Sequence, residues 1–317
     1  MRCARELWLS SPVIAPPPVP SKIPVPQRRI GLRGVLHSGE PLILPGATDA
    51  AGAMLIQAAG FSAVYATGAG IANAQLGLPD IGLASQAEFL EQTRRMAAAC
   101  DLPVVADVDT GFGGVPSVIR TVQLFEAAGA SGLQLEDQVM PKRCGHFEGH
   151  ALVDIDEMVG KIRAAVAARS DEATLLIART DARGVYGLEE AIRRGQAYLD
   201  AGADALFVEA PRSYEELTRI GSTFGGALLV ANMVEGGKTP MPPVAELASL
   251  GFRIILFANF LMRTMLFAGQ QALAHLAMEL ETASYQDRML SWADRQSLFG
   301  LAEFEAAENH FLGTAGT

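Results

Sequence analysis

The sequence predicts an α/β fold, specifically a closed (β/α)8 barrel of the TIM type. Eight short apolar segments alternate with segments of helical pattern, and this alternation is typical of a parallel sheet covered by helices. The alternating region runs from residue 36 to 281, close to the roughly 250 residues of a typical eight-unit barrel. A doubly wound open sheet is the alternative, but the turn at residues 68–70 does not read GxGxxG, so a dinucleotide site has little support.

Each strand is predicted from a short apolar run, and each helix from a start signal followed by helical apolar spacing. The expected strands cover residues 42–46, 63–67, 103–109, 132–137, 175–179, 205–209, 228–232 and 253–257. The expected helices cover residues 50–59, 85–100, 116–128, 154–169, 188–200, 244–250 and 260–281, with a short one after residue 213. Ser85 and Glu88 have capping-box spacing, and Pro116 occupies a helix start, where its missing N–H costs nothing.

The composition argues against several classes of function. The net charge is −10 and no long run of Lys or Arg occurs, whereas nucleic acids and anionic membranes bind basic surfaces. No apolar run approaches the ~20 residues of a transmembrane helix. Cys3, Cys100 and Cys144 are scattered and odd in number, which fits a reducing, cytoplasmic setting rather than a disulfide framework.

We expect two regions of different character. Residues 1–30 form a proline-rich, mobile arm, and residues 31–317 form a single barrel domain with a C-terminal helical tail. The last barrel helix, at 260–281, is more apolar than an outer helix should be. Either the tail at 285–312 covers it or another subunit does. We expect a homo-oligomer, because apolar surface of this extent seldom stays exposed.

Polar side chains stand at the carboxyl ends of six predicted strands, where barrels of this kind carry their catalytic residues. These residues are Tyr65, Thr67, Asp107, Asp109, Glu136, Arg179, Glu209 and Asn232. A helix cap or a salt bridge explains any one of them alone. Their convergence on one rim indicates a functional site.

The acidic members of this set predict a metal site. Asp107 and Asp109 are two residues apart, so in a strand they point to the same face. Two such carboxylates repel unless a cation or proton intervenes. With Glu136 on the neighbouring strand they form an oxygen-rich site suited to Mg²⁺. An acid pair balanced by Arg179 alone is the alternative, and no Cys/His spacing indicates zinc.

The loop after the fourth strand contains Lys142, Arg143, Cys144, Gly145 and His146. Neighbouring cations tune the pKa of a thiol, so Cys144 is a candidate for acid–base chemistry. A solvated basic loop with an incidental Cys is the alternative. The position of the loop after a strand that ends in Glu136 favours the catalytic interpretation.

Six motifs together resemble the isocitrate lyase/phosphoenolpyruvate mutase superfamily, nearest its methylisocitrate lyase and dimethylmalate lyase branch. They lie at residues 65–68, 78–80, 107–113, 136–138, 142–146 and 178–182, and the similarity extends from about residue 36 to 312. The resemblance implies a barrel whose eighth helix is exchanged between subunits of a dimer or tetramer. It also implies Mg²⁺, with Mn²⁺ as the alternative, and a small carboxylate substrate.

The resemblance implies roles for individual residues as well. Asp107 would ligate the metal directly, while Asp80, Asp109 and Glu136 would hold metal-bound water. Cys144 would be the general acid/base on a mobile gating loop, and the other catalytic residues would be Tyr65, His146, Glu209 and Arg179. The substrate would be bound by Thr67, Gly68, Ala69, Arg143, Arg179, Asn232, Val234 and Arg263.

The function implied is a Mg-dependent carbon–carbon lyase. It would cleave a substituted 2-hydroxy di- or tricarboxylate, of the 2-methylisocitrate or dimethylmalate type, to pyruvate or a related 2-oxo acid plus a carboxylate. The alternatives are a carboxyphosphonoenolpyruvate-type phosphonomutase, a 2-oxo acid decarboxylase or hydrolase, and a non-catalytic barrel. Val234 stands where methylisocitrate lyases carry Thr, which favours a smaller or more apolar substituent. Arg263 matches a carboxylate-binding Arg of those enzymes, and residues 257–260 look more like the mutase branch.

Overall fold

The computed structural model describes residues 22–143, 145 and 149–313. Residues Ile23–Leu280 form one compact unit, and the described residues 281–313 belong to a second one. The second unit contains the 3₁₀ helix η1 (Ala283–Arg288) and the helices α12 (Trp292–Leu298) and α13 (Leu301–Leu312). The first unit carries the candidate site. No helix in the described part of the chain is long and apolar enough to span a membrane.

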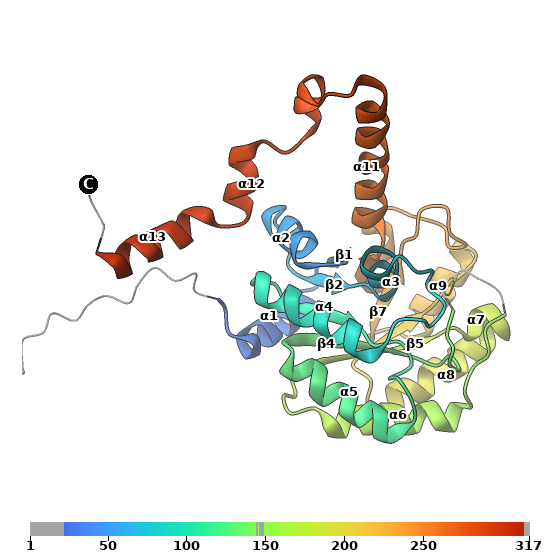
Figure 1. The fold of residues 1–317 in the computed structure, drawn as a ribbon. Coiled ribbons are helices and arrows are strands. Elements are labelled where there is room, and N and C mark those ends of the chain that lie inside the picture. Colours follow the sequence, from blue (N-terminus) through green and yellow to red (C-terminus); the bar gives the residue numbers. More distant parts are fainter. Residues whose placement is uncertain (1–21, 144, 146–148, 314–317) are drawn as a thin grey trace, which may run out of the picture. The chain divides into compact units, whose positions relative to one another are not determined.

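Eight parallel strands pair in chain order and close into a barrel, as the sequence predicts (Figure 1). Closure occurs where β1 pairs with β8, with Leu44 opposite Leu256. The strands are β1 (Leu42–Ala47), β2 (Val64–Ala66), β3 (Val104–Asp107), β4 (Ala130–Glu136), β5 (Leu175–Thr180), β6 (Ala205–Val208), β7 (Leu228–Asn232) and β8 (Phe252–Phe257).

Helices surround these strands and follow the predicted order. The predicted ones are α2 (Ala50–Ala58), α4 (Gln86–Ala99), α5 (Val115–Ala127), α6 (Ile155–Ala168), α8 (Leu188–Asp200), α9 (Tyr214–Thr223), α10 (Val244–Ser249) and α11 (Phe260–Glu279). Three helices were not predicted: α1 (Val25–His37), α3 (Gly68–Leu76) and α7 (Ala182–Val185). The expected capping box at α4 is present, since Ser85 and Glu88 satisfy each other's backbone N–H groups.

Helix α1 begins inside the segment that the sequence assigns to the arm, so residues 25–30 are helical. Pro24 is its N-cap and Pro26 lies in its first turn, where a missing N–H is harmless. Leu32 on this helix packs into the cluster of apolar side chains inside the barrel. Arg29 donates hydrogen bonds to the carbonyls of Glu126 (2.9 Å) and Ala130 (3.0 Å). These contacts attach α1 to the end of α5 and the start of β4.

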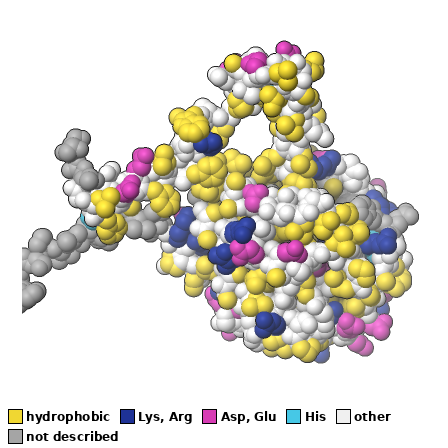
Figure 2. Space-filling view, in the orientation of Figure 1, with side chains coloured by type: hydrophobic (Ala, Val, Ile, Leu, Met, Phe, Trp, Pro, Cys, Tyr) yellow, Lys and Arg dark blue, Asp and Glu magenta, His cyan; other side chains and the backbone are white. Residues whose placement is uncertain are grey.

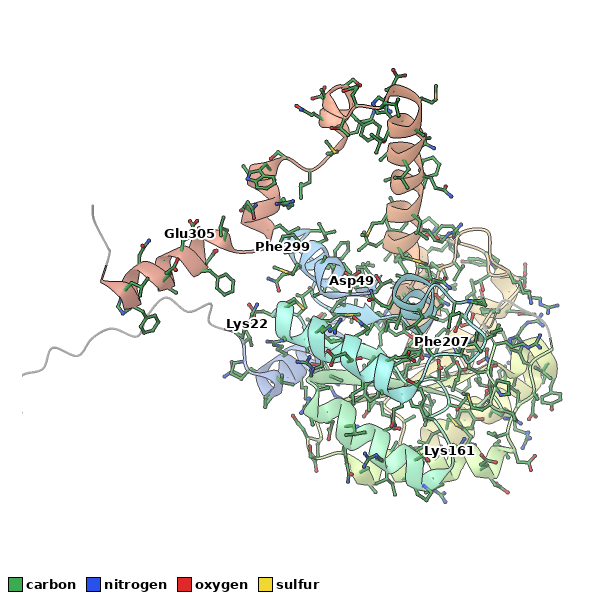
Figure 3. All side chains as sticks on the ribbon, viewed as in Figure 1. Lys22, Asp49, Lys161, Phe207, Phe299 and Glu305 are labelled. Carbon is green, nitrogen blue, oxygen red and sulfur yellow. The ribbon has the colours of Figure 1, made fainter. Side chains whose placement is uncertain are left out.

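Two apolar layers hold the barrel together. Alternate strand residues point inward, where Val105 and Phe207 belong to one cluster, or outward, where Val104 and Ala106 pack beneath the helices. Figure 3 shows Phe207 inside the barrel and Lys161 on the outer ring of helices. The inward-pointing residues at the carboxyl ends of the strands form the floor of the site.

Candidate active site

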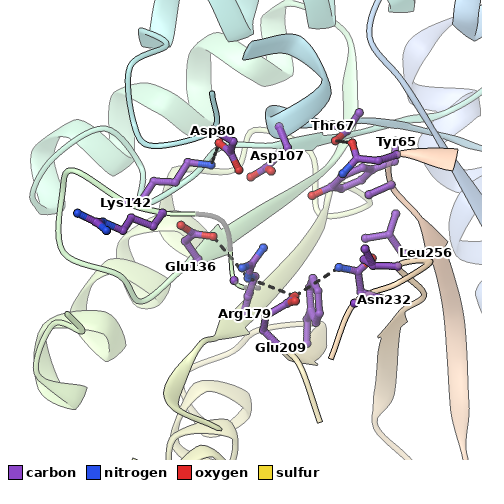
Figure 4. A pocket seen from close by; sticks show the side chains of 18 of the residues that line it. Tyr65, Thr67, Asp80, Asp107, Glu136, Lys142, Arg179, Glu209, Asn232 and Leu256 are labelled. Atoms are coloured by element: carbon purple, nitrogen blue, oxygen red, sulfur yellow. Dashed lines mark hydrogen bonds and ion pairs between the residues drawn. The ribbon is translucent and has the colours of Figure 1, made fainter. Parts of the chain in front are cut away.

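A pocket of about 260 Å³ opens at the carboxyl ends of strands β2 to β8 (Figure 4). Its lining includes eleven of the residues predicted from sequence: Tyr65, Thr67, Ala69, Asp80, Asp107, Glu136, Arg143, Arg179, Glu209, Asn232 and Val234. Lys142, Gly145, Phe207, Glu235, Gly236, Gly237, Leu256, Ala258 and Asn259 also line it. The polar strand ends therefore do converge on one rim.

The remaining predicted residues have different positions. Gly68 lies just behind the lining, because a Cβ built there would be 2.7 Å from Asp107 Oδ2. Arg263 is half exposed and outside the lining, and it donates to the backbone oxygen of Glu235 at 2.8 Å. Cys144 and His146 lie outside the described residues.

The glycine-rich segment after β2 is the start of α3, not the turn that the sequence predicted. Thr67 is the N-cap, and its hydroxyl accepts a hydrogen bond from Gly70 N at 3.4 Å. The close approach of Thr67 Cγ2 and Thr48 Cγ2 leaves no room for a Cβ at Gly70. Thr67 Oγ1 also lies 3.3 Å from Asn259 Oδ1, so the cap faces the pocket.

Lys142 connects the loop after β4 to the acidic cluster. Its ammonium nitrogen lies 2.5 Å from Asp80 Oδ1 and 2.9 Å from Asp109 Oδ1, and the Lys142 side chain is buried. Burial alone lowers the pKa of Lys142, but the surrounding carboxylates, led by Asp109 and Glu136, raise it well above its usual value. Lys142 is therefore a fixed positive charge among these acids.

The position of Asp109 differs from the prediction. Strand β3 ends at Asp107, and Asp109 has a positive φ of 46°, so strand alternation does not relate the two carboxylates. Asp109 is buried under the pocket against Lys142. Burial raises the pKa of the Asp109 carboxyl to about 7, since the charge of Lys142 offsets only part of the desolvation.

Two acids in this cluster suit a cation. Asp107 is held in place at one oxygen, because its Oδ1 accepts from Asp109 N (3.1 Å) and Gln134 Nε2 (3.4 Å). No described residue donates a hydrogen bond to the buried Glu136 Oε1, and burial raises the pKa of Glu136 well above its usual value. Within residues 22–143, 145 and 149–313, no three His, Cys, Asp or Glu side chains form a direct ligand set. The cluster therefore fits Mg²⁺ bound mostly through water, as that ion prefers.

Gln134 is a site residue that the sequence analysis missed. Tyr65 OH donates to Gln134 Oε1 at 2.7 Å, and Gln134 Nε2 in turn donates to Asp107 Oδ1 at 3.4 Å. Burial, reinforced by the charge of Asp107, raises the pKa of Tyr65 well above its usual value, so the phenol keeps its proton and remains a donor. The missed signal was spacing, since Gln134 lies two residues before Glu136 and faces the same side of β4.

Arg179 occupies the opposite wall. Arg179 donates two hydrogen bonds to the Asp181 carboxylate, from Nε at 3.0 Å and from Nη2 at 2.8 Å. Its Nε lies 3.5 Å from Glu136 Oε2 and 3.7 Å from Glu209 Oε2 (Figure 4), and the guanidinium lies over the Phe207 ring. Burial opposes the charge, but these acids, led by Asp181, hold the pKa of Arg179 well above its usual value. Asp181 is a second site residue that the sequence motifs did not predict.

The loop after β4 reaches this wall at Gly145. A Cβ there would be 2.5 Å from Glu209 Cγ and 2.6 Å from Arg179 Nη2. Only glycine therefore permits such close packing against these two side chains. The pocket thus combines a carboxylate cluster, a largely buried arginine and a loop that contacts both.

Comparison with known proteins gives consistent matches. The family model for phosphoenolpyruvate phosphomutase matches residues 32–277. The 2,3-dimethylmalate lyase of Eubacterium barkeri is 42% identical over 284 residues, covering 88% of this chain and 96% of that protein. A probable 2-methylisocitrate lyase 2 of Corynebacterium glutamicum is 42% identical over 280 residues, covering 88% of this chain and 91% of that protein.

Solved structures agree. A 2,3-dimethylmalate lyase, a member of the PEP mutase/isocitrate lyase superfamily, superimposes with a TM-score of 0.85 at 33% identity, covering 93% of this chain and 98% of that chain. A phosphonopyruvate hydrolase in complex with oxalate and Mg²⁺ superimposes with a TM-score of 0.82 at 31% identity, covering 90% of this chain and 99% of that chain.

Proposed function

Because this chain belongs to the phosphoenolpyruvate phosphomutase family, we propose that it is a Mg-dependent carbon–carbon lyase. Its substrate is a substituted 2-hydroxy di- or tricarboxylate of the 2,3-dimethylmalate or 2-methylisocitrate type. The products are pyruvate, or a related 2-oxo acid, and a carboxylate. The family assignment confirms the resemblance seen in the sequence motifs, and lyases are the relatives at 42% identity.

One observation carries the proposal: the acidic cluster around Asp107 and the largely buried Arg179 face the same small pocket. Cleavage of a carbon–carbon bond next to a hydroxyl leaves a carbanion on one fragment and a carbonyl on the other. A buried cation that binds the carboxylate, opposite a group of acids that holds a metal, is the arrangement this reaction needs.

We assign Mg²⁺ to the acidic cluster, with Mn²⁺ as the alternative. Asp107 would hold it directly, because the Gln134 and Asp109 N–H groups fix its carboxylate through Oδ1. The other three acids, Asp80, Asp109 and Glu136, would bind its water shell. When bound, the metal polarises the substrate's hydroxyl and carboxylate oxygens.

The substrate-binding residues divide into two groups. Thr67, Gly68 and Arg179 hold the oxo-acid carboxylate and oxygen, with Arg143 and Asn232 beside them. Ala69 and Val234, which line the pocket, contact the variable substituent, and Arg263 lies outside the lining next to Glu235, from where it would attract a further carboxylate. Val234 offers no hydrogen bond to an extra carboxylate, and Arg263 is engaged by Glu235, so dimethylmalate is the favoured substrate type.

Proton transfer is assigned to Cys144, with Tyr65, His146 and Glu209 as the accompanying catalytic residues. The carbanion fragment needs a proton, and a thiol whose pKa lies near working pH can donate it. Gly145, the next residue, contacts Glu209 and Arg179 closely, which supports an approach of the Cys144 loop to the reacting atoms.

The test is a coupled assay for 2-oxo acid release over substituted malates and 2-methylisocitrate, with and without EDTA. We expect cleavage of 2,3-dimethylmalate that stops when Mg²⁺ is removed. Turnover that is indifferent to EDTA would remove the metal from the proposal. Full activity of the Cys144→Ser variant would remove the assigned general acid.

A phosphonate reaction on the same fold is the second candidate, favoured by the structural similarity to a phosphonopyruvate hydrolase. Phosphorus NMR with phosphonopyruvate and carboxyphosphonoenolpyruvate distinguishes the two. Conversion of a phosphonate without cleavage of any hydroxy acid would replace the lyase assignment by a mutase or hydrolase. Measuring CO₂ release with 2-oxo acids as substrates tests the remaining alternative, a decarboxylase.

We also propose that the enzyme is a cytoplasmic homo-oligomer, a dimer or tetramer. Helix α11 extends away from the barrel (Figure 1), and Met262 is its one buried residue. Leu266, Phe267, Leu273 and Met278 on it are each more than half exposed, and hydrophobic side chains are visible over this region in Figure 2. A second subunit that covers α11 removes this apolar surface from water. Sedimentation analysis of the wild type and Leu273→Glu tests this, and a monomeric wild type would contradict it.

A further inference from the structure

Directly behind the pocket, Asp137 holds a buried carboxylate that accepts four hydrogen bonds. The side chain of this residue is fully buried and is not part of the pocket lining. Oδ2 accepts from Thr180 Oγ1 (2.8 Å), Tyr198 OH (2.8 Å) and Arg194 Nη1 (3.1 Å), and Oδ1 accepts from Asp181 N (2.9 Å). The four donors satisfy both oxygens of the carboxylate.

One of these donors leads into the pocket. The backbone N–H of Asp181 donates to Asp137, and the Asp181 carboxylate accepts two hydrogen bonds from Arg179. A shift of the Asp181 backbone therefore moves the group that fixes the guanidinium. The remaining acids around Arg179 are farther away, at 3.5 Å (Glu136) and 3.7 Å (Glu209), and they fix its orientation less strictly.

The donors to Asp137 come from separate elements. Thr180 and Asp181 stand at the end of β5, while Tyr198 and Arg194 project from α8. Asp137 itself follows β4, directly after the pocket residue Glu136. Burying a charge with this many partners does not by itself favour stability over an apolar core of the same shape. The hydrogen bonds to Asp137 do fix one arrangement of the ends of β4 and β5, which carry Glu136 and Arg179.

We propose that Asp137, through the hydroxyls of Thr180 and Tyr198, positions Arg179 to bind the carboxylate of a 2-oxo acid. Asp181 transmits this effect, so these four residues are positioning residues and none of them contacts substrate. The inference rests on the proposed function in one respect, the assignment of Arg179 to carboxylate binding.

Strand β5 offers a matched pair of variants for the test. Thr180→Val removes a hydroxyl that donates to buried Asp137 at the pocket end of the strand. Thr174→Val removes one that donates to Glu126 Oε1 at 2.6 Å, just before the opposite end of the strand. Both changes delete a buried hydroxyl–carboxylate hydrogen bond at nearly constant shape. Thr180→Val also removes the acceptor of the Ala182 N–H, so we expect it to lower the melting temperature at least as much as Thr174→Val does.

Ligand binding separates the two variants. We expect Thr180→Val to bind oxalate about tenfold more weakly in saturating Mg²⁺, while Mg²⁺ affinity is unchanged and Thr174→Val matches the wild type. Thr180→Ser should restore oxalate affinity. Tyr198→Phe should repeat the loss, because it removes a donor to the same Asp137 oxygen but leaves the Ala182 N–H bond to Thr180 Oγ1 intact.

Crystal structures of the wild type and Thr180→Val complete the test. We expect the Arg179–Asp181 pair to lengthen, or Arg179 to adopt a second rotamer. An unchanged pair together with wild-type oxalate affinity in Thr180→Val would overturn the positioning role. If the wild type binds no oxalate, the proposed function fails, and the Arg179 geometry in the two crystals still decides whether Asp137 positions it.

Discussion

Lys142 Nζ lies 2.9 Å from Asp109 Oδ1, and both side chains are buried. The ammonium also contacts Asp80, so it forms ion pairs with two of the four carboxylates that we assign to Mg²⁺. We predict that Lys142→Met lowers the free energy of unfolding by about 3 kcal/mol without Mg²⁺, because it leaves buried carboxylates without their counter-ion. Saturating Mg²⁺ should recover part of this loss by binding the same acids in the folded state.

Chemical denaturation with and without Mg²⁺ measures both effects. Lys161→Met is the matched control, since Lys161 is also buried but its one ion pair among the described residues is with Glu157, whose side chain is half exposed. We expect the control to lose little stability and to respond to Mg²⁺ as the wild type does. Equal losses in the two variants, with no difference in their Mg²⁺ response, would show that Lys142 does not act through the acidic cluster.

The pKa of Asp109, about 7 in the metal-free protein, predicts how Mg²⁺ binding depends on pH. Below pH 7 the carboxyl is protonated and must lose that proton before it can accept from the water shell of the ion, so affinity should fall by up to tenfold for each unit of pH. Above pH 7 the carboxylate is already charged and affinity should level off. The neighbouring charges of Lys142, Asp80 and Asp107 all contribute to this value.

Titration calorimetry between pH 6 and pH 8, in buffers of different ionisation enthalpy, measures both the affinity and the protons released. Asp109→Asn should remove the proton release near pH 7. A Mg²⁺ affinity that is constant over this range would show that Asp109 is ionised before the metal binds.

The repeating pattern of the barrel was predictable because strand and helix periodicities are local properties of the chain. The strand at 228–232 and the helix at 188–200 match their predicted bounds. Helix α1 was missed because Pro24, its N-cap, and Pro26, in its first turn, continue the proline-rich segment, and α3 because Gly68 and Gly70 disfavour a helix in isolation. Tertiary packing stabilises both helices.

The site was predictable only in part, for a related reason. Residues at strand ends could be placed on one rim from topology alone, and eleven of the predicted site residues line the pocket. Which side chains pair is decided by three-dimensional contacts. Three features depend on such contacts and leave no distinctive motif in the sequence. They are the hydrogen bonds from Arg179 to Asp181, the ion pair of Asp109 with Lys142, and the position of Gln134 between Tyr65 and Asp107.

Gly145 should tolerate no side chain. In Gly145→Ala the new Cβ would lie 2.5 Å from Glu209 Cγ and 2.6 Å from Arg179 Nη2, so the loop or both side chains must move. We predict that kcat/KM falls about 100-fold, the effect typical of a small misplacement in an active site. Gly184→Ala on α7 is the control, because a Cβ added at Gly184 would have no atom within 4 Å. Activity of Gly145→Ala within twofold of the wild type would mean that the close packing is not needed for turnover.

Val234 should set the preference between substrates. It lines the pocket after β7, at the position where methylisocitrate lyases carry a carboxylate-binding Thr. Val234→Thr keeps the shape and adds a hydroxyl, and one added hydrogen bond is worth about 1 kcal/mol, which corresponds to roughly fivefold in a rate ratio. We therefore predict that the ratio of kcat/KM for 2-methylisocitrate to that for 2,3-dimethylmalate rises about fivefold.

The measurement is a competition assay with both substrates present, so that enzyme concentration and active fraction cancel. Val115→Thr, at the start of α5 and partly exposed, is the control and should leave the ratio unchanged. If Val234→Thr also leaves it unchanged, the tricarboxylate is discriminated elsewhere, and the pairing of Arg263 with Glu235 becomes the next determinant to vary. Glu235→Gln frees Arg263 from a charged partner, and it should then raise the same ratio by strengthening the attraction for the third carboxylate.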